Sequence, residues 1–231
     1  QDEGFLLSKI KFRENANIIN VFSNTRGKVS GIVYGGNSRK IRNYLQISNK
    51  IFIIYSTKAE NRLGYFKTEL VEAISPKFFN DKKKTSALLS SSSILNLLLP
   101  ESQPYKNLYA SLDNLFKKFD TDDWIIDYIY WELTLLKELG FDPYLEQFFD
   151  VVSDYSTQKT IEIDNVKYKV PTFLLSQKKI KKLDNKEIRT ALSFTRNIIT
   201  NKFFLPNNLL FPKSRIILEN YFNWFATSKE K

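Results

Sequence analysis

The sequence predicts an α+β, multidomain protein in which a small five-stranded barrel, residues 1–75, precedes a mainly helical domain, residues 76–231. Short runs of β-branched and aromatic residues fill the first part, and apolar residues spaced by three and four fill most of the second. A later segment, Thr160–Val170, alternates apolar and polar residues around Asp164-Asn165. This alternation predicts a small β-hairpin among the helices.

The barrel is predicted from five strand-like runs separated by turn residues. They are Gly4–Phe12, Ala16–Ser23, Lys28–Tyr34, Asn49–Ser56 and Gly64–Leu70. Asn24-Thr25-Arg26-Gly27 predicts a hairpin turn in which Gly27 takes a positive φ. Five short strands in about seventy residues favour a closed barrel, because closure removes exposed strand edges. Among closed barrels, an OB-like barrel is the first choice for this pattern.

The helical part begins after Pro76, where apolar side chains take helical spacing. Thr121-Asp122-Asp123 offers N-caps to one helix, and Gly140 offers its C-terminal stop. The expected helices are Lys82–Leu99, Tyr105–Phe119, Trp124–Leu139, a segment from a cap at Asp184 or Asn185 to Ile199, and a segment from a cap at Ser214 to Phe225.

The charge balance favours a polyanionic partner. Lys and Arg outnumber Asp and Glu by 35 to 25 in 231 residues, a formal net charge of +10. Residues 1–75 hold 12 basic against 6 acidic residues and residues 151–231 hold 15 against 7, whereas the segment between them holds 8 against 12. Basic surfaces bind polyanions because each phosphate contact releases counterions. A charge that serves only solubility is the alternative.

The chain contains no cysteine and no histidine. An ordinary zinc site, a thiolate nucleophile, an imidazole base and a disulfide are therefore excluded, and we expect no cofactor. Apolar runs such as Ile94–Leu99 are far shorter than the ~20 residues of a membrane span, and no signal-peptide pattern precedes them. We expect a cytoplasmic protein, and the chain opens at Gln1 without indicating whether residues precede it.

The segment from Tyr34 to Arg42 is the strongest candidate for a phosphate contact. Two glycines let the backbone approach a phosphate closely, and three cations follow them within four residues. It is not a Walker-type loop, because the Gly-Lys-Ser order is missing. A solvated turn with chance basic residues is the alternative.

Cations on neighbouring strands extend this candidate surface, and strand alternation predicts Lys9, Lys11 and Arg13 on one face. Bases can stack on exposed rings of barrels that bind single strands, although most rings of a small barrel fill its core. Tyr44 is the stacking candidate because it follows the basic segment. The predicted DNA-binding residues are Lys9, Lys11, Arg13, Arg26, Lys28, Arg39, Lys40, Arg42 and Tyr44.

Short motifs along nearly the whole chain occur in a characteristic order. They are Asp2-Glu3-Gly4, Arg26-Gly27-Lys28, Gly35-Gly36-Asn37-Ser38-Arg39, Leu45-Gln46, Trp131-Glu132-Leu133, Leu135-Leu136, Leu139-Gly140-Phe141, Phe194-Thr195-Arg196 and Pro212-Lys213-Ser214-Arg215. No single motif is specific, but in this order the chain resembles the bacterial RecO recombination mediators.

One departure from that resemblance concerns zinc. Many members of the family place zinc-binding cysteines just after the Leu-Gly-Phe motif, whereas this chain carries Asp142–Phe149 there, without a ligand set. The hairpin near residues 160–170 is therefore expected to be a zinc-less counterpart of that region. The lysine-rich run Lys178–Lys182 is not part of the resemblance. It is either a solvated face or a second phosphate contact.

The resemblance implies a non-enzymatic mediator of DNA repair and homologous recombination at the nucleoid. Such a protein binds single- and double-stranded DNA, anneals complementary strands, works with RecR, and contacts the C-terminal tail of single-stranded DNA-binding protein so that RecA can load. An acidic, aromatic-ended tail needs an apolar pocket rimmed by cations. The candidate cations are Lys137, Arg189, Arg196, Lys213 and Arg215.

Two other classes of function remain open. A metal-dependent nuclease could use Asp120, Asp122, Asp123 and Asp127 as ligands, although helix caps and a solvated acidic face explain these residues better. A basic scaffold that binds only proteins is the other alternative, and it predicts no DNA binding at physiological salt.

Overall fold

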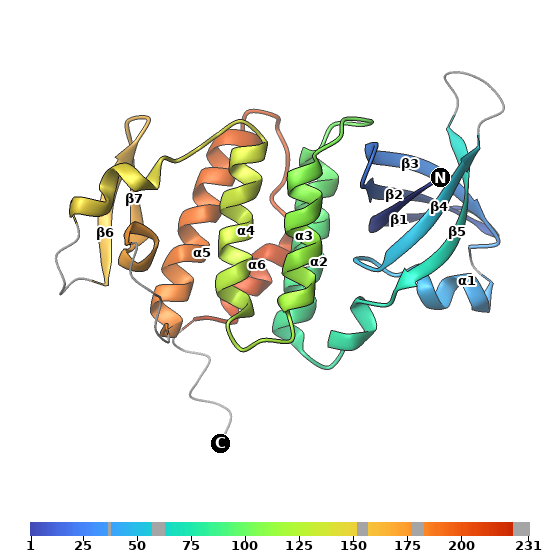
Figure 1. The fold of residues 1–231 in the computed structure, drawn as a ribbon, viewed down its shortest axis with the longest axis horizontal. Helices are drawn as coiled ribbons and strands as arrows, with labels where there is room; N and C mark the ends of the chain where they lie inside the picture. Colours follow the sequence, from blue (N-terminus) through green and yellow to red (C-terminus); the bar gives the residue numbers. More distant parts are fainter. Residues whose placement is uncertain (37, 57–62, 152–156, 177–182, 224–231) are drawn as a thin grey trace. The chain divides into compact units, whose positions relative to one another are not determined.

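The computed structural model describes residues 1–36, 38–56, 63–151, 157–176 and 183–223. These residues divide into two compact units, one of residues 1–116 with 212–215 and one of residues 117–211 with the remainder of the chain. Figure 1 shows the order of the elements in each unit. The boundary expected between residues 75 and 76 stays a prediction.

The first unit begins with a closed barrel of strand order β1-β2-β3-β5-β4. The strands are β1 (Asp2–Arg13), β2 (Ala16–Ser23), β3 (Gly27–Tyr34), β4 (Lys50–Ser56) and β5 (Gly64–Glu72). Neighbouring strands are antiparallel except β3 and β5, which pair in parallel at Gly31–Gly64 and Ile32–Tyr65. The α+β class with an OB-like N-terminal barrel, expected from the sequence, is confirmed.

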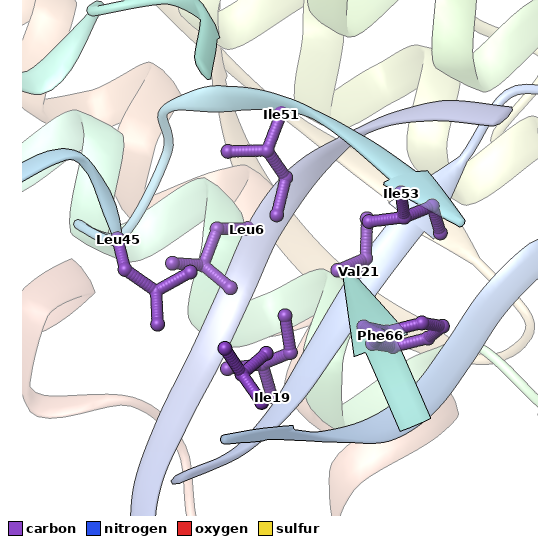
Figure 2. Packing of buried hydrophobic residues seen from close by; sticks show 8 residues of the cluster. Leu6, Ile19, Val21, Leu45, Ile51, Ile53 and Phe66 are labelled. Atoms are coloured by element: carbon purple, nitrogen blue, oxygen red, sulfur yellow. The ribbon is translucent and has the colours of Figure 1, made fainter. Parts of the chain in front are cut away.

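The barrel core consists of inward-facing aliphatic side chains and one phenylalanine (Figure 2). Its members are Leu6, Ile19, Val21, Val33, Leu45, Ile51, Ile53 and Phe66. Gly31 keeps the space for the Phe66 ring, because a Cβ at residue 31 would lie 2.6 Å from that ring. Burying one side chain of this size stabilises the fold by about 1.5–3 kcal/mol, so this cluster holds the strands together.

Two features require a glycine at residue 27, namely the conformation of its turn and the close approach of a neighbouring loop. Gly27 has a φ of +73°, as the hairpin turn requires, and a Cβ there would lie 1.8 Å from the carbonyl oxygen of Gln103. A side chain is therefore excluded at this position by both backbone conformation and space.

Helices follow the barrel in the first unit. They are the 3-10 helix η1 (Ser75–Phe78), α2 (Lys82–Leu98) and α3 (Lys106–Lys118). Asp81 caps α2 by accepting a hydrogen bond from the backbone N–H of Lys84. The serine run in α2 is buried, and the Ser92 hydroxyl lies 2.8 Å from that of Ser48. This contact ties the buried face of α2 to the residues that precede β4.

The second unit contains helices and a two-stranded sheet. Its elements are α4 (Trp124–Glu138), the 3-10 helix η2 (Leu145–Val151), β6 (Gln158–Ile163), β7 (Val166–Pro171), the 3-10 helix η3 (Thr172–Leu175), α5 (Asn185–Ile199), the π-helix η4 (Thr200–Phe204) and most of α6 (Lys213–Asn220). The hairpin turns at Asp164 and Asn165, which both have positive φ. Of the two caps expected for α5, Asp184 is the one that forms, and it makes a capping box with Glu187.

Several sequence expectations differ from the structure. Helix α6 begins at Lys213, so Ser214 is not its N-cap, and it ends at Asn220; Phe225 lies outside the described residues. Asp123 occupies the N-cap position of α4 but makes no side-chain capping bond. No helix in the described segments is long and apolar enough to cross a membrane.

Candidate nucleic-acid interface

A six-residue helix that the sequence did not predict, α1 (Arg39–Tyr44), carries three of the candidate cations. Gly35 takes a φ of +70° and accepts a hydrogen bond from the Ser38 N–H, and the Ser38 side chain then accepts one from Ile41. Gly36 leaves room for the Asn17 side chain, because a Cβ there would lie 2.4 Å from the Asn17 amide nitrogen. The two glycines therefore serve to start a helix at the end of β3.

Helix α1 presents its cations to solvent. Ile41 and Tyr44 pack against the barrel core, and Leu45, just beyond the helix, is fully buried. Arg39, Lys40 and Arg42 are all exposed. The sequence expectation that these three cations lie together is consistent with this placement.

Stabilisation of α1 explains only Arg42 among these three cations, because Arg42 lies in the last turn, where positive charge favours the helix dipole. No carboxylate in the described part of the chain pairs with them, and two of them occupy the first turn, where positive charge opposes the helix dipole. Their electrostatic attraction is therefore available to an external anion.

Lys9 adds a cation beneath α1. Its ammonium group donates a hydrogen bond of 2.7 Å to the carbonyl of Leu45. Burial and the nearby charge of Arg42 lower the pKa of Lys9 below its ordinary value. The two side chains therefore contribute to one positive region.

Lys11 and Arg13 lie near the same end of the barrel but not on one face. A β-bulge between them pairs Lys11 with Asn17 and Arg13 with Ala16, the neighbouring residue of β2, so their side chains point to opposite faces. The expected single face for Lys9, Lys11 and Arg13 is therefore wrong. Both Lys11 and Arg13 are nevertheless exposed.

Arg26 and Lys28 lie at the other end of β3. Arg26 lies 5.9 Å from the Tyr55 ring and lines a hollow of about 500 Å³. Lys28 is 12% exposed and donates to the carbonyl of Asn96 at 3.0 Å, with Glu101 at 3.8 Å. Lys28 is therefore engaged in the fold, and the predicted cations do not form one continuous set.

Tyr44, the stacking candidate from the sequence, is packed into the fold and does not present a free ring. Its ring packs against the barrel core, and its hydroxyl donates to the Thr68 carbonyl at 2.7 Å. Sequence reasoning did not select Tyr34, which is 52% exposed and stacks on Tyr65 with ring centroids 5.4 Å apart.

The candidate tail-binding cations do not share one pocket. Arg189 and Arg196 line a hollow of about 440 Å³, whereas Lys137 lines another of about 280 Å³ and pairs with Asp142 at 3.0 Å. The hydrogen bond and charge of Asp142 raise the pKa of Lys137. Lys213 is exposed, and Arg215 is fully buried, which excludes Arg215 from an exposed rim.

The hollow beside α5 is basic. Its lining includes five cations, namely Lys167, Lys169, Lys186, Arg189 and Arg196. Glu219 is the carboxylate among its lining residues, and it pairs with Arg196 at 2.9 Å. An aromatic-ended tail is expected to need an apolar pocket, but among the described residues Tyr168 is the only aromatic or aliphatic one that lines this hollow.

The acidic segment before α4 has no ligand arrangement. Asp127 pairs with Lys118 at 2.7 Å, and within the described segments no group of three or more acidic side chains is placed to hold a metal ion. Asp127 is therefore engaged in an ion pair of the fold.

Comparison with known proteins gives matches along most of the chain. The family model "Recombination protein O N terminal" matches residues 1–74, and "Recombination protein O C terminal" matches residues 80–208. A "DNA repair protein RecO" from Wolbachia sp. subsp. Drosophila simulans (strain wRi) is 34% identical over 143 residues, or 61% of this chain and 59% of that protein.

Two further relatives carry the same name. The one from Ruegeria sp. (strain TM1040) is 31% identical over 142 residues, covering 61% of this chain and 59% of the relative. The one from Roseobacter denitrificans (strain ATCC 33942 / OCh 114) is 31% identical over 147 residues, covering 63% of this chain and 61% of the relative. The matched part thus spans less than two thirds of each relative.

Proposed function

The chain belongs to the RecO family of DNA repair proteins, and from this premise we propose that it is a recombination mediator that binds single- and double-stranded DNA and anneals complementary strands. It works with RecR to load RecA onto DNA covered by single-stranded DNA-binding protein. It acts in the cytoplasm at the nucleoid, and it makes and breaks no covalent bond.

The observation that carries the DNA-binding proposal is the set of cations near α1. Arg39, Lys40 and Arg42 are exposed on one short helix, Lys9 lies beneath them, and Lys11 and Arg13 extend from the adjoining strand. Annealing requires a positive surface that offsets strand repulsion. It also requires contacts to phosphates rather than to pairing edges, so that bases stay free to pair.

Reversal of the three α1 charges tests this proposal. We expect Arg39→Glu, Lys40→Glu and Arg42→Glu together to weaken binding of unrelated single strands and duplexes about equally, because phosphates carry no sequence information. The slope of log affinity against log salt should fall by about 0.7–0.9 for each phosphate that the variant no longer neutralises. Fluorescence anisotropy over a salt series measures both quantities.

A matched control changes net charge by the same amount elsewhere in the first unit. Lys77→Glu, Lys82→Glu and Lys106→Glu alter three exposed lysines that lie outside α1. This control should keep most of the affinity. Equal affinity of the α1 variant and the wild type in low salt would refute the proposed contact.

We further propose that the basic hollow beside α5 receives the acidic tail of single-stranded DNA-binding protein. The five cations that line it match the charge of such a peptide. Arg189→Glu should weaken binding of a synthetic tail peptide at least tenfold in titration calorimetry, whereas Lys137→Glu, in a separate hollow, should not. The reverse ranking of these two variants would move the tail to the other hollow.

A further inference from the structure

An exposed tyrosine, Tyr34, ends β3, and a short turn connects it to the cationic helix α1. Tyr34 is 52% exposed, the largest exposure of any aromatic ring in the described barrel strands. Its hydroxyl forms no hydrogen bond with the described part of the chain. The ring is therefore not required to fill the core or to satisfy a buried polar group.

Tyr65 supports the Tyr34 ring from one side. The two rings are stacked, with centroids 5.4 Å apart and an interplanar angle of 29°. Tyr65 is itself fixed in the sheet by the parallel pairing of β3 and β5 at Ile32. A supported ring loses little conformational freedom when a ligand stacks on it, and this preorganisation favours binding.

The other exposed rings of the barrel are occupied. The Arg13 guanidinium lies 5.1 Å above the Phe12 ring, and Tyr55 contacts both Phe66 and Arg26. In the described strands, Tyr34 thus combines a large exposure with a face that no cation covers. This difference singles out Tyr34 from its neighbours.

Arg13 lies near Tyr34 across β2, and the cationic helix α1 follows Tyr34 along the chain. Strand register places Tyr34 opposite Ala16 and Ala16 opposite Arg13, so the Cα atoms of Tyr34 and Arg13 are about two strand spacings, or 10 Å, apart. Beyond the end of β3, α1 packs near Gly35, where a Cβ would lie 3.7 Å from Ile41. A strand with a base at Tyr34 would therefore have Arg13 near one of its phosphates, and the α1 cations lie on the segment that follows Tyr34.

We infer that the free face of Tyr34 is a stacking site for one base of a single strand, a site that rests on the DNA-binding function proposed above. A single strand can turn an unpaired base onto the ring, while its phosphates contact Arg13 and the α1 cations. A duplex cannot, because both faces of its bases are already stacked. Stacking uses the base face and leaves its pairing edge free, so the site is compatible with annealing.

Replacement of Tyr34 tests the site. The variant Tyr34→Leu keeps an apolar cover on the strands but removes the aromatic face, and Tyr34→Trp enlarges that face. Tyr34→Leu should weaken binding of a thymidine oligomer by about tenfold, the usual value of one stacked base. Its affinity for a duplex and for an abasic strand of equal length should be unchanged, as should its salt slope.

Controls separate this inference from the DNA-binding proposal. Phe79→Leu removes an aromatic ring that is 81% exposed in the same unit and should bind like the wild type. Tyr34→Trp should bind the oligomer at least as tightly as the wild type. Thermal unfolding and the duplex affinity of Tyr34→Leu verify that the barrel is intact.

Two outcomes would overturn the inference differently. If Tyr34→Leu binds the oligomer like the wild type while the α1 charge reversal weakens binding, stacking at Tyr34 is wrong and the DNA-binding function stands. If the wild type binds none of the three nucleic acids in low salt, the proposed function fails and the stacking site fails with it.

Discussion

Asp2 ties the start of β1 to the turn between β2 and β3. Its carboxylate accepts hydrogen bonds from the Ser23 hydroxyl, from the Thr25 hydroxyl at 2.6 Å and from the Thr25 N–H at 2.9 Å. Burial acts to raise the pKa of Asp2, but these hydrogen bonds outweigh it, and the pKa is lowered overall. The ionised form is therefore the one that stabilises the fold.

The lowered pKa of Asp2 predicts a pH-dependent contribution to stability. Since the folded pKa lies below the unfolded value of about 3.9, the contribution is fully present above pH ~5 and is lost as pH falls through the folded pKa. Asp2→Asn should lower the free energy of unfolding by about 1–2 kcal/mol at pH 7 and by much less near pH 2. Urea unfolding at both pH values measures this.

A control for Asp2 is an exposed carboxyl group on the same barrel. Glu69 on β5 is exposed, and Glu69→Gln should leave the free energy of unfolding nearly unchanged at both pH values. A constant difference between the wild type and Asp2→Asn across this pH range would contradict the assignment.

At the scale of elements, a lysine outside the hairpin of β6 and β7 contacts the turn of that hairpin. The Lys202 ammonium pairs with Asp164 in the hairpin turn and lies 4.6 Å from the centroid of the Phe141 ring. A single cation thereby connects the turn of the hairpin to the segment that follows α4. In many members of the RecO family, zinc-binding cysteines lie in this region.

Removal of this cation should loosen the hairpin locally. We expect Lys202→Met to lower stability by about 1 kcal/mol, since exposed ion pairs and cation–π contacts each contribute modestly. Amide hydrogen exchange should accelerate in β6 and β7 but not in the barrel. Lys169→Met, which changes an exposed lysine within β7, is the control, and faster exchange in both variants would contradict a specific role of Lys202.

The elements were predictable from sequence where apolar side chains alternate or recur over a long segment. The five strands and helices α2 to α5 follow this rule. Helix α1 was not predicted, because six residues that begin after two glycines resemble a loop. The bulge between Lys11 and Arg13 has no sequence signal, so alternation placed these cations on one face incorrectly.

The outward orientation of Tyr34 follows from strand alternation in the sequence. Val29 and Val33 flank Gly31 with the alternation of an inward face, and the same alternation turns Tyr34 outward. Proximity to the basic segment instead favoured Tyr44, whose hydroxyl is bound to Thr68. Burial of Arg215 depends on tertiary packing and could not be predicted from local sequence.

At the scale of the whole molecule, the fold assembles from apolar packing in a chain without cysteine or histidine. Structural zinc contributes directly to folding in proteins that contain it, because binding and folding are coupled. Here the buried aliphatic and aromatic side chains of both units must supply the stability.

Metal removal should therefore leave the protein unchanged. The midpoint of thermal unfolding and the affinity for DNA should be the same with a chelator, without additions, and with added zinc. A family member that carries the cysteine set, measured alongside, should lose stability in the chelator. A fall in the midpoint of this protein with the chelator, reversed by zinc, would contradict the expectation.

The turn at Gly27 limits which inherited changes this protein can tolerate. Any replacement there would push the hairpin away from the loop that holds Gln103, since both space and φ exclude a side chain. Such an allele would act by lowering the amount of folded protein, because it destabilises the barrel and leaves the exposed α1 cations themselves unchanged. Raising expression would then compensate only partly, whereas alleles of the α1 cations would, on the DNA-binding proposal above, give an abundant protein that binds weakly.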